Sequence, residues 1–174
     1  MRKTQAHRLM TPDPIEIAAR FNDVRAQSLH LAAPLSAEDQ CVQSMPDASP
    51  TKWHLAHTTW FWETFVLSEH APGYTLHDER YPFLFNSYYV QAGERHCRAQ
   101  RGYLSRPTVE QVYAYREAVD RAMEAFLDAL DEAEHPAIAD VIEVGLHHEQ
   151  QHQELMVTDI KYVFSVNPLR PAYR

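Results

Sequence analysis

The chain has 174 residues, of which 45% are hydrophobic and 23% are charged, as is typical of one globular domain. Its formal net charge of −8 argues against a nucleic-acid-binding surface and against binding to an anionic membrane, because both depend on clustered Lys and Arg. The 4 Gly and 11 Pro favour long regular elements separated by rigid breaks, and disfavour turn-rich β folds.

The cysteine content and the hydropathy pattern bear on the cellular compartment. Only Cys41 and Cys97 are present, too few for the disulfide framework of a small secreted domain. No apolar run reaches the 18 residues or so that a membrane-spanning helix needs. We therefore expect a cytoplasmic protein, with residues 1–13 as a poorly ordered N-terminus.

The first predicted helix covers residues 14–33. Asp13 precedes Pro14, a combination common at helix starts, and Pro34 ends the helix. Ser36 and Asp39 then predict the cap of a short helical turn. One face of the helix is marked by residues at alternating spacings of four and three: Ile17, Phe21, Val24, Ser28 and Leu31.

The second predicted helix begins at Ser49-Pro50, is rich in aromatic residues and ends near His70, before Pro72-Gly73. Residues 74–106 show no clean period, and we expect them to form one long structured connection. A connection of this length without regular structure is uncommon unless it has a function.

The third and fourth predicted helices cover residues 108–135 and the segment from 136 to just before Pro168. Thr108 and Gln111 are spaced as a capping box. The interior seam predicted for the fourth helix consists of Ile138, Val141, Gly145, His148, His152, Leu155, Asp159 and Tyr162. The fold class is therefore all-α, a four-helix bundle over residues 14–166 with one long crossover, followed by a tail at 167–174 that resembles a domain boundary.

The chain contains 11 His, and two of them lie one helical turn apart. His148 and His152 fall on one face of the fourth helix, where both imidazoles can reach one metal ion. Spacing alone is weak evidence, because chance would give roughly 0.7 such pairs in a chain this rich in His. Their place in the interior seam strengthens the metal hypothesis, although two core His bonded to carboxylates or water would fit the same pattern.

A third ligand is available on the second helix, which carries His54 and His57. We favour His57, since it shares a face with the helix's aromatic residues, and assign His54 and Glu154 to an outer shell around the ligands. Three neutral imidazoles leave coordination positions open, which suits reaction chemistry better than a closed structural site.

The long connection carries Arg95, Arg98 and Arg101 within seven residues. Solvated arginines on an aromatic-packed loop are the simplest interpretation. If the loop covers the open face of the metal, Arg95 and Arg98 are placed to bind a carboxylate-bearing substrate.

Four segments together resemble the N-terminal DinB-like domain of the ergothioneine-type sulfoxide synthases. They are SPTKWHLAHTTWF at 49–61, FNSYY at 85–89, RHCRAQRGYLSRP at 95–107 and HEQQHQEL at 148–155. Cys97 stands where related sequences commonly have Pro. The resemblance implies a mononuclear non-haem Fe(II) site with His57, His148 and His152 as ligands. Its implied reaction uses O2 to join the sulfur of cysteine or γ-glutamylcysteine to C2 of the imidazole of hercynine, which leaves a sulfoxide.

The same resemblance implies roles for further residues. Gln151 matches the position that contacts the imidazole substrate, and Arg95 and Arg98 match arginines that hold the carboxylates of the thiol substrate. In the family a C-terminal domain, similar to the formylglycine-generating enzyme, supplies a catalytic Tyr and much of the pocket. We therefore expect such a domain as a partner and little turnover from these 174 residues alone.

Two other functions remain open on sequence grounds. A stand-alone DinB-like thiol transferase or hydrolase would hold Zn²⁺ or Ni²⁺ at the same three His and would need no oxygen. A non-catalytic, metal-stabilised binding bundle would use the metal for structure only. The sequence does not decide whether two copies pair into a homodimer.

Overall fold

The computed structural model describes residues 14–89, 93–130 and 135–173, and within these ranges every regular element is helical. The prediction for residues 1–13 lies outside them. The long elements are α1 (Pro14–Ala32), α2 (Thr51–Trp62), α5 (Val109–Ala129) and α6 (His135–Val166). A π-helical segment, η2 (Glu63–Leu67), and α3 (Ser68–His70) continue α2 without a break. The predicted all-α fold is thus confirmed.

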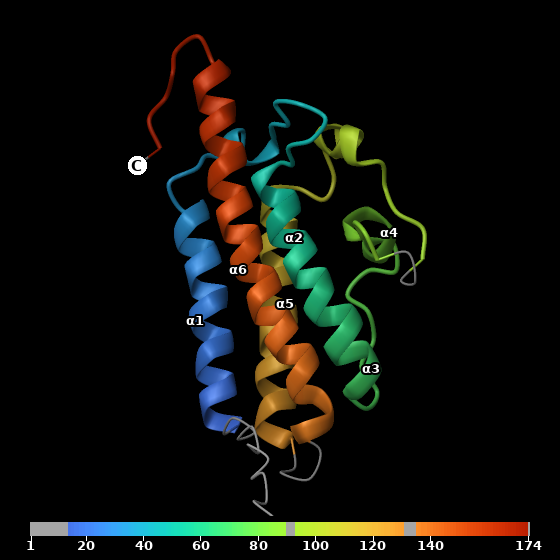
Figure 1. Cartoon of the computed structure of the whole chain (residues 1–174). Helices are drawn as coiled ribbons and strands as arrows, with labels where there is room; N and C mark the ends of the chain where they lie inside the picture. The colour runs from blue at the N-terminus through green and yellow to red at the C-terminus, as the bar shows by residue number, and fades with distance from the viewer. Residues whose placement is uncertain (1–13, 90–92, 131–134, 174) are drawn as a thin grey trace, which may run out of the picture.

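The four long helices form a closed ring in which α1 packs on α5 and α6, and α2 also packs on α5 and α6. In Figure 1, α1 and α6 run toward one end of the bundle, whereas α2 and α5 run toward the other. The chain therefore passes from one end to the other between α3 and α5, as the single long crossover predicts. No helix among the described residues is long and apolar enough to cross a membrane.

The crossover contains two short helices that the sequence did not predict, α4 (Tyr81–Phe85) and the 3₁₀ segment η4 (Arg98–Tyr103). Buried Tyr81 and Phe85 pack against the buried ring of Tyr115 on α5, which anchors the crossover to the bundle. Another short 3₁₀ helix, η1 (Asp39–Cys41), follows the predicted cap, in which Ser36 and Asp39 exchange backbone-to-side-chain hydrogen bonds of 2.9 and 3.1 Å.

Helix α5 begins as predicted and ends sooner. Thr108 and Gln111 form the expected capping box, with hydrogen bonds of 2.8 and 3.1 Å. The helix stops at Ala129 rather than near 135, because Leu130 adopts an extended conformation. Carboxylates at the C-terminal end of a helix oppose its dipole, and Asp128 lies in the last turn.

The buried stripe of α6 agrees with the predicted seam at Ile138 and Gly145 and departs from it further along the helix. Leu155 and Tyr162 were assigned to the interior, but they are 39% and 42% exposed. The stripe passes instead through Ile142, Leu146, Glu149, Met156, Ile160 and Val163. The sequence pattern did not indicate this stripe, because the charged residue Glu149 lies in the middle of it. Because the helix is rotated in this way, His148 and His152 lie at the border of the core and are only partly buried.

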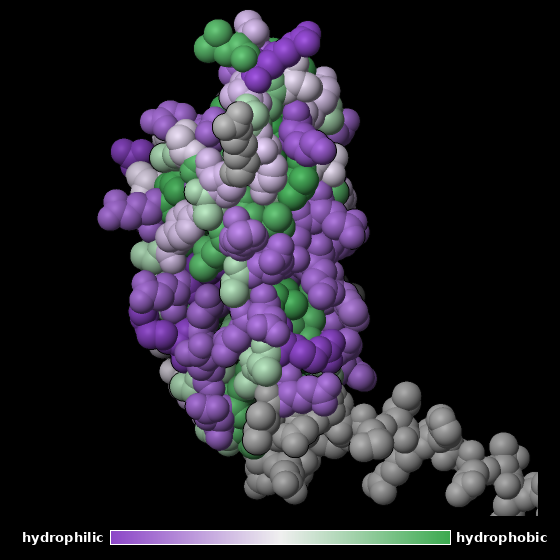
Figure 2. Space-filling view, turned by 90° about the vertical axis from the view of Figure 1, so that its left-hand side faces the viewer, coloured by the Kyte–Doolittle hydropathy of each residue, from purple (hydrophilic) through white to green (hydrophobic). Residues whose placement is uncertain are grey.

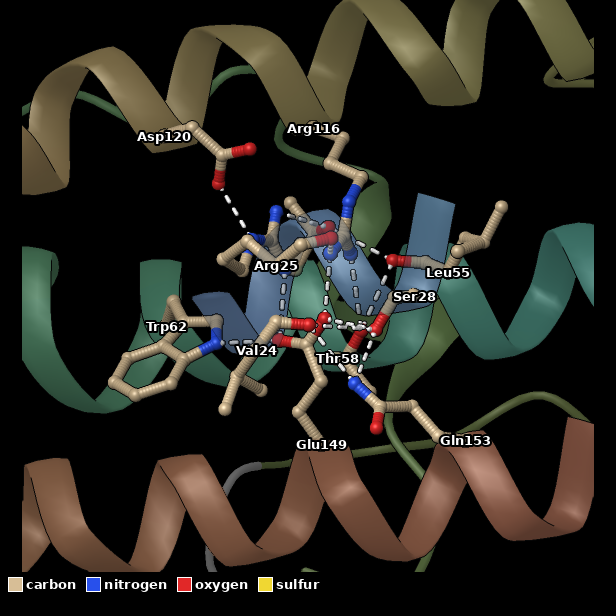
Figure 3. Close-up of polar contacts among 11 residues, drawn as sticks. Val24, Arg25, Ser28, Leu55, Thr58, Trp62, Arg116, Asp120, Glu149 and Gln153 are labelled. Atoms are coloured by element: carbon tan, nitrogen blue, oxygen red, sulfur yellow. Dashed lines mark hydrogen bonds and ion pairs between the residues drawn. The ribbon is translucent and has the colours of Figure 1, made fainter. Parts of the chain in front are cut away.

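Glu149 is 1% exposed and joins α6 to the other three long helices (Figure 3). It accepts hydrogen bonds from Arg116 of α5 at 2.5 Å, from Arg25 of α1 at 3.1 Å and from the indole of Trp62 of α2 at 2.9 Å. Burial alone would raise the pKa of Glu149, but the charges of Arg116 and Arg25 outweigh it and lower the pKa to about 2. This network fixes the register of α6 one residue away from His148.

The face of the bundle that carries α1 is largely polar (Figure 2). Figure 2 shows the face that carries α1, where hydrophilic residues predominate and hydrophobic ones form small patches. On this side Arg20 of α1 pairs with Glu143 of α6 at 2.7 Å. The functional features lie elsewhere, between α2, α6 and the crossover.

Candidate metal centre

Three histidines from two helices converge beside the crossover. One ring nitrogen from each of His57, His148 and His152 lies within 4.8 Å of the other two. Nε2 of His57 and Nε2 of His148 lie 3.1 Å apart. The structure therefore brings together the three residues that the sequence analysis singled out as ligands.

His57 is held in one orientation from both sides. Its Nδ1 donates a hydrogen bond of 2.5 Å to the carbonyl oxygen of Phe85, at the end of α4. Its ring stacks on Trp53 at a centroid distance of 4.6 Å and on Trp60 at 5.4 Å. Since Nδ1 carries the proton, Nε2 presents a lone pair to the other two histidines.

His148 and His152 face His57 from successive turns of α6. The ring of His148 packs against Phe61 at 4.7 Å, and its Nδ1 is buried without a hydrogen-bond partner among the described residues. His54, which we assigned to an outer shell, lies behind His152, with the two Nδ1 atoms 2.9 Å apart. It therefore contacts a member of the cluster from outside.

The environment keeps the cluster uncharged at neutral pH. Burial, and then the neighbouring His148, hold the pKa of His57 well below its ordinary value. Burial lowers the pKa of His148 to about 4 and also depresses the pKa of His152 and of His54. Neutral imidazole is the form that ligates a metal, so the cluster is ready to bind one without first losing protons.

The distance between one pair of these nitrogens fits two ligands of a single divalent ion. Two nitrogens about 2.0 to 2.1 Å from one ion lie roughly 2.8 to 3.4 Å apart at octahedral to tetrahedral angles. The 3.1 Å between Nε2 of His57 and Nε2 of His148 falls in this range. Imidazole donors suit iron, nickel and zinc alike, so the donor set is compatible with each of these metals and does not distinguish among them.

The cluster opens into a cavity of about 390 Å³ between α2, α6 and the crossover. Gln151 and Arg98 line it, as expected of residues near a substrate. The guanidinium of Arg98 is held at the cavity mouth by the hydroxyl of Tyr88 and the carbonyl oxygen of Asp47. This wall combines positive charge with aromatic surface.

Two of the predicted site residues lie further away. Arg95 is exposed and donates to the carbonyl oxygen of Ser87, and it is not among the residues that line the cavity in the described structure. Glu154 is exposed on α6 and is not a lining residue either. Neither side chain contacts the three histidines in this arrangement.

Arg101 lines the cavity, although no sequence pattern favours it over the neighbouring arginines. It is 4% exposed, lies 3.3 Å above the centroid of the Trp53 ring, and donates to the hydroxyls of Ser49 at 2.9 Å and Ser87 at 3.0 Å. Burial, and then the charge of Arg98, lower its pKa to about 9, which leaves it charged at neutral pH. Arg is seldom buried, so its place in the wall could not be predicted.

Comparison with known proteins agrees with this architecture. A search of curated proteins found no match. The family model described as the DinB superfamily matches residues 20–156, which include all four long helices in whole or in part and the three clustered histidines. The chain therefore belongs to the DinB superfamily.

Proposed function

We propose that His57, His148 and His152 bind Fe(II), and that the domain is the metal-binding module of an O2-dependent sulfoxide synthase. The reaction would join the sulfur of a thiol, cysteine or γ-glutamylcysteine, to C2 of the imidazole of hercynine. The S–H and C2–H bonds would be broken, and O2 would take up four electrons, with one oxygen atom left on sulfur and the other released as water. The observation that carries the proposal is the convergence of three neutral imidazoles on one open cavity. Domains of this superfamily commonly bind divalent metals, and the likeness of four sequence segments supports the finer assignment.

Bound iron would supply the redox chemistry with O2 that sulfoxide formation requires. The protein's part is to bind and orient two organic substrates beside the three histidines. In the proposal the carboxamide of Gln151 binds the imidazole substrate, and the guanidinium of Arg98 pairs with a carboxylate of the thiol. Arg95 supports the Ser87 backbone in the present arrangement and would need to turn toward the cavity to contact the same substrate.

The proposal includes a second domain over the cavity. Gln151, Arg98 and Tyr88 all line the cavity and are exposed to solvent, so the substrate positions are open on one side. Closing an active site expels water and limits side reactions of reactive intermediates. A domain similar to the formylglycine-generating enzyme, which the sequence resemblance implies, would close this side and contribute the catalytic Tyr.

The test combines metal binding with activity. Metal-free chain is titrated anaerobically with Fe(II) and then supplied with hercynine, a thiol and O2, with and without the second domain added as a separate protein. We expect one Fe(II) per chain, little turnover alone and sulfoxide product when both domains are present. Failure to bind Fe(II), or absence of product with both domains, would contradict the proposal.

A zinc- or nickel-dependent thiol transferase or hydrolase is the second candidate. The described cluster contains three nitrogen donors and no carboxylate, a set that also suits Zn²⁺. Zinc in protein purified without added metal, together with turnover that does not need oxygen, would favour this function. Metal that raises thermal stability but supports no turnover under either condition would instead indicate a non-catalytic bundle.

A further inference from the structure

A chain of polar contacts leads from the metal cluster through His54, which also lines the cavity, to Asp159 on α6. Nδ1 of His152 lies 2.9 Å from Nδ1 of His54, and Nε2 of His54 lies 3.0 Å from Oδ2 of Asp159. Oδ2 of Asp159 also accepts a hydrogen bond of 2.9 Å from the backbone N–H of Ser49, just before α2. The side chain of His54 is 4% exposed and that of Asp159 is 14% exposed, so both lie largely within the protein.

The contacts determine where the protons lie. An ionised carboxylate only accepts hydrogen bonds, so Nε2 of His54 donates to Asp159. A neutral imidazole carries one proton, which leaves Nδ1 of His54 as an acceptor. Nδ1 of His152 must therefore donate to it, and Nε2 of His152 is left with the free lone pair that a metal needs.

The same logic applies on the other helix, where Nδ1 of His57 donates to the carbonyl oxygen of Phe85. Two of the three clustered imidazoles are thus fixed by a hydrogen bond at Nδ1. The two partners differ in chemistry, because one is a backbone carbonyl and the other is a histidine backed by a carboxylate. A carboxylate behind an imidazole raises the basicity of the ring as well as orienting it.

We infer that Asp159 and His54 form a positioning relay that fixes the tautomer and the orientation of His152 as a metal ligand. The inference rests on the proposed metal site and goes beyond it by assigning two residues to support one ligand. Both ring nitrogens of His54 are already engaged, by His152 and by Asp159, so His54 acts through His152 and does not ligate the metal itself. Asp159 lies nearly two helical turns beyond His152 on α6 and reaches the site only through His54.

The test compares metal affinity in two variants with a matched control. Asp159→Asn removes the charge of the relay, His54→Phe removes both ring nitrogens, and Glu154→Gln neutralises an exposed carboxylate on the same helix. Affinity for Co²⁺ is measured by its visible absorption and affinity for Zn²⁺ by competition with a chelator. Loss of such a partner typically weakens metal binding about 10- to 100-fold, which we expect for both relay variants and not for Glu154→Gln.

Two further readouts separate positioning from a purely structural role. Thermal unfolding of the metal-free variants shows whether each one folds. If His54→Phe does not fold, the metal affinity of Asp159→Asn alone tests the relay. Long-range ¹H–¹⁵N spectra of the Zn²⁺-loaded wild type should show protons on Nδ1 of His152 and on Nε2 of His54. A contribution to folding alone would lower the unfolding temperature and leave affinity and Co²⁺ absorption unchanged.

The outcomes distinguish this inference from the proposed function. Normal metal affinity in folded Asp159→Asn, or a proton on Nε2 of His152, would overturn the relay and leave the three-His site standing. The wild-type chain could bind metal, with weaker binding in the relay variants, and still yield no sulfoxide when the second domain is added. This outcome would overturn the proposed reaction and leave the relay standing. A wild-type chain that binds none of Fe(II), Co²⁺ and Zn²⁺ would overturn both the relay and the proposed function.

Discussion

Nε2 of His57 and Nε2 of His148 lie 3.1 Å apart, although the two residues are 91 positions apart in sequence and belong to different helices. Two neutral imidazoles turn these atoms toward each other where a proton or a metal ion is shared between them. With His152, the group is a candidate metal site formed by residues of two helices.

Removing one ligand should abolish stabilisation by metal. A ligand present at 100 times its dissociation constant stabilises a protein by about 2.7 kcal/mol, so metal should raise the unfolding temperature of the wild type measurably. We expect this rise to disappear in His148→Ala and to persist in His147→Ala, whose side chain is exposed on the same helix. Thermal scans with and without metal test this, and an unchanged rise in His148→Ala would contradict the assignment.

Glu149→Gln should destabilise the bundle strongly. The substitution leaves Arg25 and Arg116 buried without their shared carboxylate, and breaking a buried ion pair from one side costs about 3 to 5 kcal/mol. Urea unfolding of the metal-free protein measures the free energy. The control Glu154→Gln, at an exposed position, should lie within about 0.5 kcal/mol of the wild type. A similarly small effect of Glu149→Gln would show that the network contributes little to stability.

Gly145→Ala should also destabilise the protein, contrary to the usual effect of this change within a helix. A Cβ atom at Gly145 would lie 2.5 Å from the Trp62 ring, which is buried and cannot withdraw. Overpacking of this kind costs about 1 to 3 kcal/mol, whereas Gly→Ala in an open helix position stabilises by roughly 1 kcal/mol. Chemical denaturation decides the sign. Val144→Ala, at a neighbouring residue that is 55% exposed, should change stability little.

The metal-free protein should lose stability as the pH falls from about 6.5 toward 4. Burial lowers the pKa of His148 to about 4 and holds the pKa of His57 well below its ordinary value, so the unfolded chain takes up protons in this window while the folded chain largely does not. Unfolding temperatures measured across the window in the presence of a chelator should decline toward acid, and less steeply in His148→Leu. A flat profile would show that these imidazoles titrate normally in the folded protein.

The sequence predicted the four long helices well, because their periodic apolar faces and their caps are local signals. Thr108 with Gln111 is one such cap, and Ser36 with Asp39 is another. It also singled out the three clustered histidines. The helical spacing indicated His148 and His152, and the neighbouring aromatic residues indicated His57. These features depend on residues a few positions apart.

The sequence did not reveal features that depend on partners from distant segments. Glu149 reads as a solvent-facing residue until Arg25 and Arg116 are placed beside it, which is why the seam of α6 was predicted one face away. Arg101 likewise takes its position from Trp53, on another element. Asp159 belongs to the predicted seam, but its contact with His54 of α2 could not be predicted. Burial of a charged group cannot be inferred without the group that compensates it.

X-ray absorption at the iron edge of anaerobically loaded wild-type chain, compared with His148→Ala, tests the metal site most directly. The account predicts one Fe(II) per chain with three imidazole ligands in the wild type and weaker, incomplete loading in the variant. Iron without imidazole ligands, or a spectrum and occupancy unaffected by His148→Ala, would contradict it.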